Sequence, residues 1–173
     1  MNYYYGGAFD PLTKAHLAII KAISENFINE DNVLFIGVTD DDEKQYTYGV
    51  KKRKEIVEDA LREYGIEATV IRQNKRTYNF LKETFSNNVI LIVGSDEYEQ
   101  LLEGKWENND KLTDEYKFIV VKRDDKPLEK KNFLRSSVKI DSRFSEFSST
   151  KARDAIRLLR NMVDKKTLKT LFE

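Results

Sequence analysis

Short segments that are apolar throughout alternate along this sequence with longer segments whose apolar residues recur at helical spacing. VLFIGV (33–38) and VILIV (89–93) are the clearest apolar segments. Such runs are typical of strands in a parallel sheet whose two faces are both covered by helices. In the helical segment 50–64, the apolar residues 56, 57, 60 and 61 share one face. The alternation predicts an α/β fold, a doubly wound parallel sheet of five to six strands with helices on both faces.

The expected elements fill the chain without a linker, a repeat or a domain boundary. We expect strands at 2–5, 33–38, 68–72, 89–93 and 118–122, with a weaker one at 138–140. Helices are expected at 14–26, 50–64, 77–85 and 96–103, and Gly65 is expected to end the second of them. The sequence therefore predicts a single domain over residues 1–173.

Composition argues against several classes of function. The 30 basic and 30 acidic residues give a formal net charge of zero, which argues against a general nucleic-acid binder. The chain has no cysteine and one histidine, so thiolate metal sites are excluded and no metal site made of protein ligands is predicted. The apolar runs are shorter than the roughly 20 residues that a membrane-spanning helix needs, and no signal-like segment follows Met1. We expect a soluble, cytoplasmic protein that binds neither nucleic acid nor membrane and that could form a homo-oligomer.

The first expected strand runs into the segment GGAFDPLTKAH, which contains the only histidine, His16. Gly6 and Gly7 are expected to let the backbone turn tightly and a ligand approach closely. The free N–H groups of the helix that follows would face this turn, and such groups bind phosphate. In open α/β sheets, ligands bind at the carboxyl ends of the strands, where this turn lies. Taken alone, His16 could instead cap its helix or pack against the core.

The same segment resembles the signature Gly-x-Phe-Asp-Pro followed by (His or Thr)-x-Gly-His of the nucleotidyltransferase superfamily with an adenylyltransferase-type Rossmann domain. The matching residues are Gly7, Phe9, Asp10, Pro11 and His16. Thr13 takes the position that is histidine or threonine in that superfamily, whereas Ala15 replaces the usual glycine. The resemblance implies a Rossmann-like fold and a site for the phosphates of ATP.

A second motif lies near the C-terminus, where residues 147–153, FSSTKAR, resemble the superfamily's Ile-Ser-Ser-Thr-x-x-Arg. Ser148 or Ser149 can cap a helix that begins near Thr150, and the N–H groups and hydroxyls there would face an anion. Arg153, one turn later, offers a forked cation suited to phosphate oxygens. We therefore expect the C-terminal helices from about residue 149 to complete the nucleotide site.

The middle of the sequence resembles the nicotinate-nucleotide adenylyltransferases. The residues that match are Gly94 and Asp96 after the fourth strand, Trp106, Arg123 after the fifth strand, the pair Thr77-Tyr78, and Arg53. At a strand end Asp96 can accept hydrogen bonds from ribose hydroxyls, and Trp106 can stack on a pyridine ring. From the residues alone, Asp96 could equally cap its helix and Trp106 could pack in the core. Gly104 and Lys105 make the spacing between them longer than in that family.

The resemblance implies an enzyme of NAD biosynthesis that transfers AMP from ATP to nicotinate or nicotinamide mononucleotide and releases pyrophosphate. It assigns catalytic roles to His16, Thr13 and Arg153. It assigns ATP binding to Gly7, Ala8, Phe9, His16, Gly94, Asp96, Ser148, Ser149, Thr150 and Arg153, and acceptor binding to Thr77, Tyr78, Trp106 and Arg123. Magnesium is expected to bind mainly through the ATP phosphates, with few or no protein ligands.

Two other kinds of function stay open from the sequence. One is a different nucleotidyltransferase: pantetheine-phosphate adenylyltransferases also carry threonine at the position of Thr13, although their Arg-Gly-Leu-Arg segment is absent from this sequence. Cytidylyltransferases are less favoured because they usually keep both histidines of the signature. The other kind is a nucleotide-binding module without turnover, which Ala15 and the irregular spacing before Trp106 favour. The sequence does not choose between nicotinate and nicotinamide.

Overall fold

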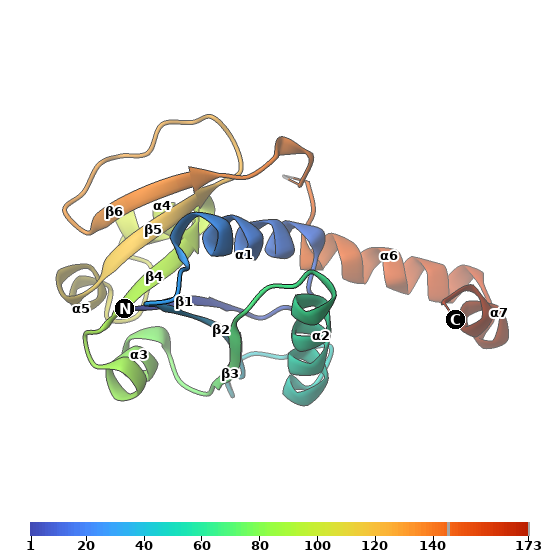
Figure 1. Ribbon diagram of the computed structural model, residues 1–173. Coiled ribbons are helices and arrows are strands. Elements are labelled where there is room, and N and C mark those ends of the chain that lie inside the picture. Colours follow the sequence, from blue (N-terminus) through green and yellow to red (C-terminus); the bar gives the residue numbers. More distant parts are fainter. Residues whose placement is uncertain (145, 173) are drawn as a thin grey trace.

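Six parallel strands form one sheet in the computed structural model, which describes residues 1–144 and 146–172 (Figure 1). Their order in the sheet is β3-β2-β1-β4-β5-β6. The strands are β1 (Asn2–Gly7), β2 (Val33–Thr39), β3 (Thr69–Gln73), β4 (Val89–Gly94), β5 (Lys117–Lys122) and β6 (Leu134–Lys139). The strand order reverses between β1 and β4, and the crevice at such a reversal is where open α/β sheets bind ligands.

Helices cover both faces of the sheet. They are α1 (Lys14–Phe27), α2 (Val50–Glu63), α3 (Thr77–Phe85), α4 (Ser95–Leu102) and α5 (Asn109–Glu115). The chain continues after β6 with a 3-10 helix at Ser142–Phe144 and the helices α6 (Ser149–Met162) and α7 (Lys165–Phe172). Buried residues of α1 and α2 form one apolar cluster with the sheet, and those of α3, α4 and α5 form a second cluster on the opposite face (Figure 1). The doubly wound, Rossmann-like α/β fold expected from the sequence is therefore confirmed.

The central strands are apolar throughout because each of their faces belongs to a different cluster. In β1, Tyr3 and Tyr5 pack with α1 and α2, whereas Tyr4 packs with α3. In β4, Ile92 belongs to the first cluster and Leu91 to the second. Successive side chains of a strand point to opposite faces, so burial on both faces requires apolar residues at every position.

The expected helices before residue 105 and the first five expected strands lie within two residues of the observed elements, and α3 coincides with its expected range. Gly65, at φ 63°, directly follows Tyr64, the C-cap of α2, and so ends this helix as expected. The sixth strand begins at Leu134, before the expected 138–140. Its sequence LRSSVK alternates between half-buried and exposed residues, so no apolar run marked where the strand begins. The helix α5 was not expected, since its sequence NDKLTDE buries only Leu112.

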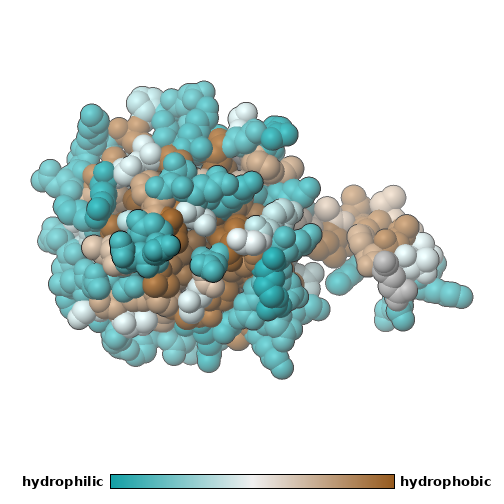
Figure 2. Space-filling view, viewed as in Figure 1, coloured by the Kyte–Doolittle hydropathy of each residue, from teal (hydrophilic) through white to brown (hydrophobic). Residues whose placement is uncertain are grey.

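The helices α6 and α7 form an arm that projects from the body of the molecule (Figure 1). Neither helix contains a buried residue among those described. Figure 2 shows apolar surface on this arm, where Leu158, Met162, Leu171 and Phe172 are all at least 60% exposed. None of the helices within the described residues combines the length and the apolar character needed to cross a membrane. The possible homo-oligomer stays a prediction.

Candidate active site

The turn between β1 and α1 differs from the expected one in how it uses its glycines. Gly6 and Gly7 both belong to β1, and neither has a positive φ; the residue in the left-handed region is Phe9, at φ 47°. The expectation that the glycine pair makes the turn is therefore wrong. A Cβ on Gly7 would lie 3.0 Å from Cζ of the Phe9 ring. Gly7 is needed because it leaves room for that ring.

Phe9 lies beneath the turn and supports the histidine. Its ring is 1% exposed and packs edge-on against Tyr5, at 5.7 Å between centroids, and against His16, at 5.2 Å. Phe9 was predicted to bind ATP; because its side chain is buried in the core, only its backbone is left for that role, which stays a prediction. Its position instead fixes the plane of the His16 ring.

His16 is held by the residue that caps its own helix. The backbone N–H of Thr13, the N-cap of α1, donates to Nδ1 of His16 at 2.9 Å, and the Thr13 hydroxyl lies 3.0 Å from the same nitrogen. A backbone amide can only donate, so Nδ1 is the acceptor and the ring proton sits on Nε2. Burial, and secondarily the nearby Arg123 guanidinium, lowers the pKa of His16 to about 4. His16 is therefore a neutral imidazole whose Nε2–H is available to a ligand.

The C-terminal motif packs directly onto this turn. Ser148 is the N-cap of α6 and accepts a hydrogen bond from the N–H of Lys151 at 3.1 Å. The Ser149 hydroxyl donates to the carbonyl of Pro11 at 2.8 Å, and Nη1 of Arg153 donates to the carbonyl of Asp10 at 2.7 Å. The two sequence motifs thus meet in space, and the N-terminus of α6 adjoins the turn that carries His16.

Asp10 and Arg53 connect this turn to the neighbouring strand. The buried carboxylate of Asp10 accepts hydrogen bonds from the N–H groups of Thr47, at 2.8 Å, and Tyr48, at 3.0 Å. Arg53 is 0% exposed. It donates to three carbonyls, each at 2.8 Å, which are those of Ala8, Thr39 and Tyr48. These bonds fix the end of β1 against the end of β2 and the start of α2.

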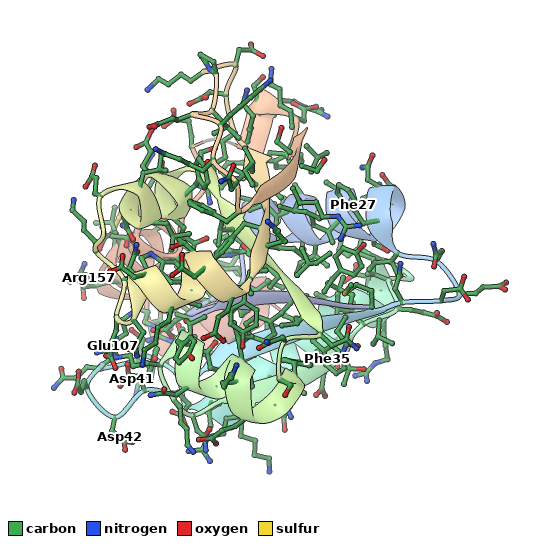
Figure 3. The ribbon with its side chains drawn as sticks, turned by 90° about the vertical axis from the view of Figure 1, so that its left-hand side faces the viewer. Phe27, Phe35, Asp41, Asp42, Glu107 and Arg157 are labelled. Carbon is green, nitrogen blue, oxygen red and sulfur yellow. The ribbon has the colours of Figure 1, made fainter. Side chains whose placement is uncertain are left out.

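A cleft of about 350 Å³ opens beside the turn, at the carboxyl ends of β1 and β4. Its lining includes Gly7 from the end of β1 and Ala8 from the turn. It also includes Thr77 and Trp106, two of the residues predicted to bind the acceptor. Further polar residues of the lining include Lys44 and Lys105, and four to which sequence reasoning gave no acceptor-binding role, Tyr46, Gln73, Arg76 and Glu97. Arg76 forms ion pairs with Asp41 at 3.1 Å and Glu107 at 3.4 Å. Figure 3 shows these two carboxylates close together, beside the loop that carries Asp42.

Comparison with known proteins shows the family to which this chain belongs. The model of the cytidylyltransferase-like family matches residues 4–155, which is most of the chain. The chain belongs to the cytidylyltransferase-like family. This is a family of nucleotidyltransferases, so the resemblance that the two motifs carry is confirmed.

Individual relatives of this cytidylyltransferase-like protein carry two different names. A probable nicotinate-nucleotide adenylyltransferase of Endomicrobium trichonymphae is 27% identical over 88% of this chain and 84% of its own length. The phosphopantetheine adenylyltransferase of Wolbachia pipientis wMel is 26% identical over 84% of each chain. That of Lactococcus lactis subsp. cremoris is 36% identical over 66 residues, so this chain matches only 37% of that relative's length.

Among solved structures, the nicotinic acid mononucleotide adenylyltransferase of Plasmodium falciparum complexed with APC matches with a TM-score of 0.68. The match has 21% sequence identity and covers 88% of this chain and 82% of that chain. At this identity, the likeness supports the fold of the cytidylyltransferase-like family.

The structure separates the four residues predicted to bind the acceptor. Thr77 and Trp106 line the cleft, but Tyr78 and Arg123 do not. The Tyr78 hydroxyl donates to Glu115 of α5 at 2.9 Å, outside the cleft. Arg123 acts electrostatically on His16 and on Glu97. In this cytidylyltransferase-like protein, Arg123 therefore lies near His16 and Glu97 but not in the lining of the cleft.

Glu97, and not Asp96, caps the helix that follows β4. The Glu97 carboxylate accepts the N–H of Gly94, the N-cap residue of α4, at 2.8 Å, whereas Asp96 is exposed in the first turn of α4. Burial raises the pKa of Glu97 above its ordinary value. Because Glu97 caps α4, the carboxylate of Asp96 stays available for a ligand at the end of β4.

The described residues hold no group of three or more His, Asp or Glu side chains placed to bind a metal. The expectation that magnesium binds mainly through the ATP phosphates stays a prediction.

Because the pKa of His16 is lower in the folded protein than its ordinary value of 6.5, its contribution to stability depends on pH. Between pH 6.5 and pH 4, the unfolded chain binds a proton that the folded chain does not, so stability is present at pH 7 and is lost as the pH falls. From pH 7 to pH 4.5, we expect the wild type to lose roughly 2 kcal/mol more unfolding free energy than the His16→Asn variant. Urea unfolding of both proteins at the two pH values measures this difference. Equal losses would contradict the neutral state of His16.

Proposed function

We propose that this protein is an adenylyltransferase that transfers AMP from ATP to nicotinate or nicotinamide mononucleotide and releases pyrophosphate. The observation that carries the proposal is the meeting of three features at the carboxyl ends of β1 and β4. These are the neutral His16, the N-terminus of α6 with Arg153, and a cleft lined by Trp106. Relatives that carry this name extend over most of the chain.

In the proposed reaction, an oxygen of the acceptor phosphate attacks the α-phosphorus of ATP. The bond from that phosphorus to the oxygen of the β-phosphate breaks, and the oxygen leaves with pyrophosphate. The acceptor phosphate is already ionised near neutral pH, so the reaction needs no general base. The enzyme then contributes positioning and the stabilisation of charge at the transferring phosphorus.

The two motifs divide this work between the phosphates. The Nε2–H of His16, with Thr13 and the backbone of Gly7 and Ala8, would hold the α-phosphate and the attacking oxygen. The N-terminus of α6, with Ser148 and Arg153, would hold the β- and γ-phosphates. Magnesium bound to the phosphates would neutralise part of their charge.

The cleft offers what a pyridine mononucleotide requires. Trp106 provides an aromatic face for a flat ring, and Thr77 begins a helix whose free N–H groups favour an anion. Lys44 also lines the cleft and forms no ion pair with any of the described residues, whereas Arg76 and Lys105 pair with carboxylates. Lys44 is therefore the cation best able to meet an acceptor phosphate.

The test is a pyrophosphate-release assay with ATP or CTP and one acceptor at a time. We expect nicotinate or nicotinamide mononucleotide with ATP to give kcat/KM about twofold to tenfold above phosphopantetheine, because an aromatic ring stacked on Trp106 contributes about 0.5 to 1.5 kcal/mol. Preference for CTP, or absence of product with both pyridine mononucleotides, would overturn the proposal.

A second candidate is the adenylylation of phosphopantetheine. It is favoured by the relative from Wolbachia pipientis wMel, which matches 84% of the chain, and by the threonine at position 13. Higher kcat/KM with phosphopantetheine in the same assay would select it. Release of pyrophosphate with none of the acceptors, together with binding of ATP, would instead identify a module without turnover.

A further inference from the structure

Two buried polar side chains connect the centre of the sheet to the N-terminus of α3. Tyr4 lies in the middle of β1, with 2% of its surface exposed, and its phenol donates a short hydrogen bond to Oε1 of Gln73 at the end of β3. Gln73 is 5% exposed, and its Nε2 donates to the carbonyl of Lys75 at 3.0 Å and to the hydroxyl of Thr77 at 3.4 Å. The carbonyl of Lys75 can only accept, so the orientation of the Gln73 amide is fixed.

The backbone of the sheet leaves space for this connection. A Cβ on Gly37 of β2 would lie 1.8 Å from the phenol oxygen of Tyr4, and a Cβ on Gly6 would lie 3.1 Å from Oε1 of Gln73. Two glycines in neighbouring strands thus make room for the phenol and the amide. Burial also raises the pKa of the Tyr4 phenol, which keeps it a hydrogen-bond donor.

All three members of the connection line the cleft beside the turn. Tyr4, Gln73 and Thr77 lie on its wall with Gly7 and Ala8. The N-cap residue of α3 makes no side-chain capping bond, so Gln73 provides the polar contacts at this helix end. Tyr4 and Gln73 therefore connect the N-terminal end of α3 to β1, the strand that leads into the turn carrying His16.

We propose that Tyr4 and Gln73 are positioning residues that set the affinity for the acceptor by holding the N-terminus of α3 against β1. This inference rests on the proposed function, because it assigns the α3 side of the cleft to the acceptor. Neither residue is among those to which the proposed reaction assigns the phosphates of ATP. Their loss should change the binding of the acceptor and not the chemical step or the binding of ATP.

The chain offers a matched control at the other end of the same helix. Tyr116 is also 2% exposed, and its phenol donates to the carbonyl of Ser86, the C-cap of α3, at 2.6 Å. Tyr4→Phe and Tyr116→Phe therefore each remove one buried phenol bond that holds α3. Only Tyr4 lines the cleft. A change in kinetics that arises only from lost stability should therefore appear in both variants.

We expect Tyr4→Phe to raise the KM for the acceptor about fivefold to tenfold, the loss typical of one buried hydrogen bond. The kcat and the KM for ATP should stay within about twofold, and Tyr116→Phe should leave all three within about twofold. In the double variant Tyr4→Phe/Gln73→Met, the KM for the acceptor should rise by a smaller factor than the product of the factors of the two single variants. The reason is that both substitutions break the same connection. Equal KM values for Tyr4→Phe and wild type, or equal changes in Tyr4→Phe and Tyr116→Phe, would overturn the proposal.

Amide hydrogen exchange gives a readout that does not need turnover. The N–H of Phe80 donates to the carbonyl of Arg76 in the first turn of α3, at 3.0 Å. Exchange at Phe80 should accelerate at least about fivefold in Tyr4→Phe and not in Tyr116→Phe. Absence of turnover in the wild type would overturn the proposed function alone. Unchanged exchange at Phe80 would overturn the positioning role, whatever the activity.

Discussion

The His16→Ala variant should lose about a hundredfold to a thousandfold in turnover, which corresponds to about 3 to 4 kcal/mol of transition-state stabilisation. The Nε2–H of His16 is the one ring donor that is left for a ligand, because Nδ1 is taken by the N–H of Thr13. In the proposed reaction that donor meets the charge that develops at the α-phosphate. Steady-state pyrophosphate release, with the fold checked by circular dichroism, measures the loss.

His16→Asn separates the two tasks of the ring. An asparagine amide can accept the N–H of Thr13, as Nδ1 does, but it is too short to place a donor where Nε2 lies. We expect this variant to keep the start of α1 and still to lose turnover to the same extent as His16→Ala. Turnover within about tenfold of the wild type in His16→Asn would show that His16 only caps its helix.

The contacts of this site that join residues close together in the sequence could be predicted. The contact between Thr13 and His16 joins residues three apart at a helix start, and the cap at Ser148 is equally local. The meeting of the two motifs was inferred from a family resemblance and not from spacing. The structure supplies its physical cause, because Ser149 and Arg153 bond to the carbonyls of the turn.

The distant half of the site could not be predicted, because its residues are defined by contacts between strands. Gln73 is an ordinary polar residue at a strand end until Tyr4 and Thr77 are placed beside it. The carboxylate of Glu97 was overlooked in favour of Asp96, since the sequence does not show which of the two folds back onto Gly94. The pattern of apolar residues along a sequence predicts which positions are buried. It does not predict which groups a buried amide or carboxylate contacts.

The fold itself was predicted where burial is extreme. VILIV reads as a central strand because both its faces are covered, whereas the sixth strand, at the sheet edge, has one exposed face and a mixed composition. The short helix α5 depends on tertiary contacts: Leu112 is buried, and the Asn109 side chain donates to the carbonyl of Leu101 at 3.0 Å. Segments that are stabilised mainly by distant partners escape prediction from local patterns.

Arg53→Met should lower the free energy of unfolding by about 3 to 5 kcal/mol. Methionine fills a similar length, but it leaves the carbonyls of Ala8, Thr39 and Tyr48 without the donor that each now has at 2.8 Å. Unsatisfied buried carbonyls cost about 1 to 3 kcal/mol each, and partial access of water limits the sum. Urea unfolding followed by circular dichroism measures the change.

Lys54→Met is the matched control, one residue along α2. Lys54 is partly exposed, and its pair with Glu58, at 3.9 Å, is a surface ion pair, so its loss should cost less than about 1 kcal/mol. Arg53→Met should also lower turnover, because the Ala8 carbonyl belongs to the turn to which the proposed reaction assigns the α-phosphate, whereas Lys54→Met should not. A change below about 1 kcal/mol in Arg53→Met would mean that the end of β1 is held by Asp10 and its partners alone.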